Sequence, residues 1–254
     1  MKKIKITVFI ISLLTLTSCE IVQETRFEAN GSGKYSLGFD LSEMMKMGGG
    51  TESGEKNKQL DTLIVFSEFL VAKKDSISKL SKEKQDKIKQ LEKFSLYVKA
   101  DSVSKKFEMK ISYDFDNIAE LKLFGEKLKG QNIKELELLS DKTKDINKDE
   151  DSGIPDFNKS YNTTFNKDMF SVKITPEGIA EAEKTKDTTM TKDNPMADLI
   201  RFKSRYLFPY KIENVDNENV RILPSFKGIE ISGNLFEINN NPKFFDVNIE
   251  FEHE

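Results

Sequence analysis

The stretch "FSLYVKADSVSKKFEMKISYDF", residues 94–115, decides the fold class. Apolar side chains alternate with polar ones over residues 94–100 and again over residues 107–115. The intervening "DSVSKK" has the polar composition of a turn. Strict alternation is typical of strands with one buried and one wet face, so this stretch predicts an antiparallel β-hairpin.

Other segments extend this sheet in both directions along the chain. "TRFEANGSGKYSLGFDL", residues 25–41, alternates around an Asn-Gly-Ser-Gly turn and predicts a second hairpin. Alternation also predicts strands over residues 170–174, 206–212, 229–231 and 245–251.

Helical signals lie between these strands. Residues 67–93 carry apolar side chains at spacings of three, four and seven, and Thr175-Pro176 is typical of a helix start. Asn117 followed by Glu120 resembles a capping box, and Pro195 predicts a helix that runs through "MADLIRFKSR". We therefore expect an α+β fold with six to eight strands and four or five helices. Its antiparallel sheets should be built from β-hairpins, with helices packed on one side.

The N-terminus predicts export and lipid anchoring. Three lysines precede an apolar stretch, residues 6–16, which is shorter than the roughly 20 residues needed to span a bilayer. The sequence Leu16-Thr17-Ser18-Cys19 that follows looks like a bacterial lipobox. It predicts a signal peptide over residues 1–18, cleavage between Ser18 and Cys19, and a lipid on the Cys19 sulfur. The alternative is a chance cysteine after an ordinary signal peptide.

The mature chain, residues 19–254, is long enough for one domain or for two subdomains that divide near the polar residues 141–156. A net charge of −3 argues against nucleic acid as a partner. The chain has one cysteine and one histidine, His253, and none of the usual catalytic motifs. We predict no catalytic residue, no metal and no cofactor, and we expect a protein that is not an enzyme.

Two weaker patterns remain. Within residues 145–156, oxygen-bearing side chains have a spacing that resembles a calcium loop, although a solvated acidic loop explains them as well. Asp followed by Ser or Thr and a small or apolar residue resembles the O-glycosylation sequon of Bacteroidota. It marks Thr62, Ser76, Ser102 and Thr188 as candidate acceptors. The same dipeptide also forms helix caps and turns.

Several phrases in order resemble a family of uncharacterised Bacteroidota lipoproteins. They are "CEIVQETRFEANGSGKYSLGFDLSEMM", "AKKDSISKLSKEKQDKIKQLEKF", "ISYDFDNIAEL", "LFPYKIENV" and "NPKFFDVNIEF". The resemblance spans most of the mature chain and implies a lipid-anchored envelope protein without enzymatic activity.

The sequence therefore predicts a lipoprotein of binding or scaffold type, held to the membrane by its lipid and facing the periplasm from the outer membrane. Its partner would be an unknown envelope protein. The alternative is a periplasmic carrier of an apolar ligand or lipid, with a cavity lined by residues 107–115 and 245–251. Those aromatic residues could equally well fill the core.

Overall fold

The computed structural model describes residues 19–46, 59–128 and 157–253. The strands are β1 (Cys19–Phe27), β2 (Gly33–Asp40), β3 (Gln59–Val65), β4 (Phe94–Asp101), β5 (Lys106–Phe115), β6 (Tyr161–Phe165), β7 (Met169–Ile174), β8 (Ile200–Leu207), β9 (Ile212–Val215), β10 (Val220–Ile222), β11 (Gly228–Asn234) and β12 (Val247–Phe251). The α-helices are α2 (Ser42–Lys46), α3 (Phe66–Ala72), α4 (Lys74–Ile77), α5 (Lys82–Lys89), α6 (Phe124–Leu128), α8 (Pro176–Lys184) and α9 (Leu235–Asn240). Three 3₁₀ turns are η1 (Ile118–Leu123), η2 (Phe157–Ser160) and η3 (Pro195–Asp198).

The strands form two sheets, and the fold is α+β as predicted. The larger sheet has the order β10-β11-β8-β1-β2-β5-β4-β3, and the smaller has the order β6-β7-β12-β9. The hairpins β1–β2 and β4–β5 confirm the two hairpin predictions. β1 is central in the larger sheet because it pairs with β2 on one side and with β8, in parallel, on the other.

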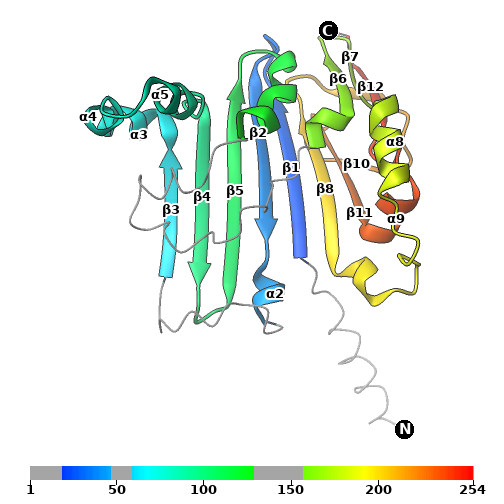
Figure 1. Ribbon diagram of the computed structural model, residues 1–254. Coiled ribbons are helices and arrows are strands. Elements are labelled where there is room, and N and C mark those ends of the chain that lie inside the picture. The colour runs from blue at the N-terminus through cyan, green and yellow to red at the C-terminus, as the bar shows by residue number, and fades with distance from the viewer. Residues whose placement is uncertain (1–18, 47–58, 129–156, 254) are drawn as a thin grey trace.

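The core lies on one face of the larger sheet. The smaller sheet stacks there through aromatic rings, with centroid distances of 4.6 Å between Phe27 and Phe165 and 5.0 Å between Phe208 and Phe251. Farther along the same face, Phe124 of α6 packs against Tyr35 at 4.8 Å. Figure 1 shows η1, α6 and the smaller sheet in front of the larger sheet, while α3, α4 and α5 gather at one end of it.

A single hydrophobic cluster joins buried residues that come before and after residues 141–156. That range, where we predicted a break between subdomains, lies outside the described residues.

The predicted helix beginning at Pro195 is wrong beyond its first turn. Only η3 is helical, and Ile200–Leu207 is strand β8. Phe202 and Tyr206 alternate there with charged residues, and β8 pairs with β1 and β11 on either side. Pairing with distant strands therefore outweighs the local helical signal.

The strand count also exceeds the prediction of six to eight, because β3, β6, β9 and β10 are short or lie at sheet edges. The helix start at Thr175 is confirmed, since the Thr175 hydroxyl accepts a hydrogen bond from the Gly178 N–H at 3.0 Å.

The turn between β1 and β2 gives a test of this packing. A Cβ on Gly33 would lie 2.1 Å from the Arg26 carbonyl oxygen and 2.5 Å from Cζ of Phe115. Gly33→Ala should therefore lower the free energy of unfolding by about 2–3 kcal/mol, measured by denaturant melts. Gly31 has φ +83°, and a Cβ added there would have no neighbouring atom within 4 Å.

The matched control Gly31→Ala should cost only about 1 kcal/mol, from its left-handed backbone. Equal losses for the two variants would contradict the close approach at Gly33.

Candidate functional site

The face of the larger sheet that points away from the core is polar, and we call it the polar face. Strand alternation brings charged and hydroxyl side chains to it from every strand, because the register aligns residues of one face across the sheet. The helices η1 and α6 and the smaller sheet lie over the opposite face (Figure 1). Within the described residues, the polar face is therefore the side of the larger sheet opposite to these packed elements.

A row of ion pairs crosses the polar face along the hydrogen-bonding direction. Glu230 of β11 is at its centre: its Oε1 lies 2.6 Å from the Arg221 guanidinium, and its Oε2 lies 2.6 Å from Nη2 of Arg205. Nη1 of Arg205 reaches Oε2 of Glu24 on β1 at 3.3 Å. Four neighbouring strands thus contribute one side chain each to a continuous chain of alternating charge, which we call the charge ladder.

Glu230 is the buried member of the ladder, with 8% of its side chain exposed. Burial acts to raise the pKa of this carboxyl, but hydrogen bonds from Arg205 and Arg221 outweigh burial and hold the pKa below its ordinary value. For Arg205, the hydrogen bond to Glu230 is the largest influence and raises the pKa of the guanidinium. Both groups therefore stay charged at neutral pH.

The same row continues as a shallow depression of about 400 Å³ in front of β2, β4 and β5. Its floor includes Ser36 and Ser112, whose hydroxyls are hydrogen-bonded at 2.9 Å. Longer charged side chains, among them Arg26 and Lys110, stand at its rim. Small serines lie between long side chains in the hollow, and its lining combines charges of both signs with the apolar side chains of Leu63, Val65 and Phe94.

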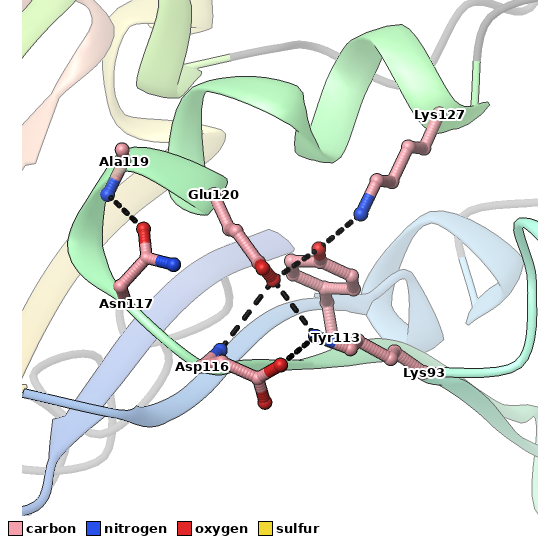
Figure 2. A network of polar contacts seen from close by, with 7 residues as sticks. All are labelled: Lys93, Tyr113, Asp116, Asn117, Ala119, Glu120 and Lys127. Atoms are coloured by element: carbon pink, nitrogen blue, oxygen red, sulfur yellow. Dashed lines mark hydrogen bonds and ion pairs between the residues drawn. The ribbon is translucent and has the colours of Figure 1, made fainter.

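A second polar network pins η1 and α6 onto the core face (Figure 2). The hydroxyl of the buried Tyr113 donates to Oε2 of Glu120 at 3.0 Å and accepts from Nζ of Lys127 at 2.5 Å. Lys93 donates to the same Glu120 oxygen at 3.0 Å and to Asp116 at 2.6 Å.

Burial, followed by the hydrogen bond to Glu120, raises the pKa of Tyr113. The hydroxyl therefore keeps its proton and acts as a fixed donor.

The capping box predicted at Asn117 forms only in part. The Asn117 side chain accepts from the Ala119 N–H at 3.1 Å, as expected of a cap. A complete box would have the Glu120 carboxylate accept from the Asn117 N–H. Instead that carboxylate accepts from Tyr113 and Lys93 and, at 3.4 Å, from the Asp116 N–H. The segment begins as a 3₁₀ turn rather than an α-helix.

Cys19, the predicted lipidation site, is the first residue of β1. Its N–H donates to the Leu199 carbonyl at 2.8 Å, and 8% of the residue is exposed. The predicted cleavage point between Ser18 and Cys19 coincides with the start of the described residues. Cys19 itself already belongs to the larger sheet.

The four candidate glycosylation acceptors lie in different settings. Ser76, Ser102 and Thr188 are exposed, whereas Thr62 is half-buried on the core face of the edge strand β3, opposite Val98. Two of the preceding aspartates serve local turns. Asp101 Oδ1 accepts from the Val103 N–H at 2.9 Å, and Asp187 Oδ1 accepts from the Thr189 N–H at 2.8 Å. At these two positions the turn explanation of the dipeptide has direct structural support.

The other sequence candidates add little to the site. The calcium-like residues 145–156 lie outside the described residues. His253 has Nδ1 3.5 Å from Asp168 and is exposed. Within residues 19–46, 59–128 and 157–253, no group of three or more His, Cys, Asp or Glu side chains could hold a metal ion. Across those same ranges, no helix is long and apolar enough to cross a membrane.

The charge ladder was missed at the sequence level. Its residues look like ordinary exposed charges in the sequence. Arg205 lies in the segment that was expected to be helical, and Arg221 lies in a strand that the sequence did not predict. The available signal is the alternation of Arg201, Lys203 and Arg205 with Ile200, Phe202, Ser204 and Tyr206, of which all but the serine are apolar, and this is a strand pattern.

No protein-family model matches the chain, and no curated protein does. Among solved structures, the chain is similar to the folded domain of the LppM protein of Mycobacterium tuberculosis, determined by NMR. The TM-score is 0.34 and the identity 10%, over 92% of this chain and 88% of that one. A likeness at this level carries no inference about fold or function, so the function is argued from the site itself.

The ladder predicts a specific response to pH. A carboxyl whose folded pKa is lowered stabilises the fold above its ordinary pKa and loses that contribution as the pH falls through the folded value. Glu230→Gln should therefore lower the free energy of unfolding by about 1–2 kcal/mol at pH 7, and the difference from the original protein should shrink below about pH 4.

Denaturant melts at several pH values measure this difference. The exposed pair of Glu83 and Lys87, 3.1 Å apart on α5, supplies the control variant Glu83→Gln, which should change stability by less than about 0.5 kcal/mol. A pH-independent loss for Glu230→Gln would contradict the role of its charge.

Proposed function

We propose that the protein is a lipid-anchored envelope lipoprotein that acts by binding, with the polar face as its contact surface. In this proposal the lipid on Cys19 attaches the protein to the outer membrane, facing the periplasm, and the partner is an envelope protein. The observation that carries the proposal is the polar face itself: a broad, charged surface with a hollow, presented on the side away from the core.

The side chains of this surface are better suited to binding a partner than to catalysing a reaction. Glu230 is engaged by two arginines, and Ser36 and Ser112 bond to each other, so these groups are held in place in their ordinary charge states. A pre-ordered polar surface loses little side-chain entropy when a partner docks. We therefore propose a scaffold or partner-contact role without enzymatic activity.

The alternative of an apolar-ligand carrier finds less support in the packing. The aromatic residues proposed to line its cavity include Phe115 and Phe251, which are 2% and 0% exposed. Phe115 lies 5.9 Å from the Phe27 ring, and Phe251 lies 6.0 Å from the Phe165 ring. These contacts favour the interpretation in which the rings fill the core.

The anchor can be tested at Cys19. Cys19→Ser removes the sulfur that would carry the lipid, so the variant should keep residues 1–18 and should not take up labelled fatty acid in a bacterial host. Intact-mass spectrometry and fatty-acid labelling measure this, with Ser18→Ala as a control that keeps the thiol and should still be labelled. Lipid labelling of the Cys19→Ser variant would contradict the anchor.

The contact surface can be tested by photocrosslinking in cells. A photoreactive amino acid at Lys110, on the rim of the hollow, should yield a defined crosslinked product, whereas the same group at the exposed Lys186 should not. Adding Arg26→Glu should weaken the Lys110 product several-fold, because it reverses a charge at the same rim.

Equal crosslinking from Lys110 and Lys186, or no effect of Arg26→Glu, would argue against the polar face as the contact surface.

A further inference from the structure

The two ends of the larger sheet are not equivalent with respect to Cys19. The register aligns Glu20 with Asp40, Asp40 with Glu108, and Glu108 with Lys99, so the start of β1 lies level with the end of β4. We call this end of the sheet the anchor end. Figure 1 shows α2 and the β4–β5 turn at this end, and α3, α4 and α5 at the opposite end.

The β4–β5 turn projects past the anchor residue. β4 and β5 remain paired as far as Asp101 and Lys106, two residues beyond the row that contains Glu20, and the turn of residues 102–105 follows. With a strand rise of about 3.3 Å per residue, the turn lies about 7–10 Å beyond that row and about 3–7 Å beyond Cys19, which is one residue nearer to this end than Glu20. Because Cys19 is the first residue of β1, a lipid on it leaves no slack between the membrane and the sheet.

The turn has a fixed shape and presents an apolar side chain between polar ones. The Asp101 carboxylate accepts hydrogen bonds from the N–H groups of Val103 and Ser104 at 2.9 and 3.2 Å and from the Ser104 hydroxyl at 2.7 Å. Lys105 adopts φ 52°. Val103 is held outward by this arrangement, with 69% of its surface exposed.

Two lysines follow this valine. Lys106 lies 3.7 Å from Glu108 on the same strand, and in the described part of the chain Lys105 makes no ion pair. An exposed apolar side chain beside lysines matches the boundary between lipid headgroups and acyl chains.

We infer that the anchor end stands on the bilayer and that the turn of residues 102–105 contacts lipid headgroups, with Val103 at the acyl boundary and Lys105 near the phosphates. This inference rests on the proposed lipid at Cys19. Contact at the anchor end would set the strands of the larger sheet at a steep angle to the membrane, so that a partner can approach the polar face from the side. A glycan on Ser102 would be incompatible with this contact, since that residue is in the turn.

The chain offers a matched pair of positions for a test. Val71 of α3 is also an exposed valine near lysines, at 78%, but it lies at the end of the sheet away from Cys19. Once the Cys19 sulfur is acylated, Val103→Cys or Val71→Cys supplies the free thiol for a fluorescent label. The full acylated protein is reconstituted into vesicles of phosphatidylethanolamine and phosphatidylglycerol that contain a spin-labelled lipid, and quenching of the two labels is compared.

The label at residue 103 should be quenched about three-fold or more beyond the label at residue 71, because quenching by lipid falls steeply with distance from the headgroups. Lys105→Glu in the Val103→Cys protein should reduce that quenching. Intact-mass spectrometry reports acylation and vesicle flotation reports membrane binding, both independently of the quenching.

Two results would overturn the inference. Acylated, membrane-bound protein with equal quenching at both positions, or with a glycan on Ser102, would overturn the orientation alone. A chain without lipid on Cys19 would overturn the anchor and the orientation together.

Discussion

The parallel pairing of β1 with β8 is the interaction on which the rest of the structure depends. It joins Cys19–Phe27 to Ile200–Leu207, strands about 180 residues apart in the chain, and it carries polar contacts on both faces. On the core face, Gln23 donates to the Ser204 hydroxyl, and on the polar face Arg205 reaches Glu24. Without this seam, β8, β10 and β11 would separate from the hairpins, and the smaller sheet would lose its packing against Tyr206 and Phe208.

This dependence explains which parts of the fold the sequence predicts. The hairpins β1–β2 and β4–β5 are local, since alternation and turn residues lie within about 25 residues, and both are predicted correctly. β8 is not local. A proline start and the apolar spacing in "MADLIRF" favour a helix until β1 and β11 are available as partners on either side. The two edge strands lack a recognisable pattern, because β10 has only three residues and the alternation of β3 is interrupted by its consecutive apolar residues 63–65.

The candidate site is even harder to predict from the sequence than strand β8. Each member of the charge ladder is an ordinary charge in the sequence, and only the register places Arg221, Glu230, Arg205 and Glu24 in one row. Once the side chains are aligned, the contacts of Glu230 with both arginines offset the cost of burying its charge. The register thus gives the polar face an ordered row of paired charges, and the proposed binding function rests on that order.

The seam also connects the anchor to the core. If Cys19 carries the proposed lipids, its acylated nitrogen would still have one N–H and could keep the hydrogen bond to the Leu199 carbonyl. A membrane attachment at this residue therefore acts on the central strand of the larger sheet, which is hydrogen-bonded on both sides, rather than on a loose tail. Force along β1 would load two rows of strand hydrogen bonds in parallel, and they would have to break together. The position of Cys19 at the start of β1 would thus couple the proposed lipid directly to a central strand of the larger sheet, and the proposed orientation on the membrane would follow from the fold.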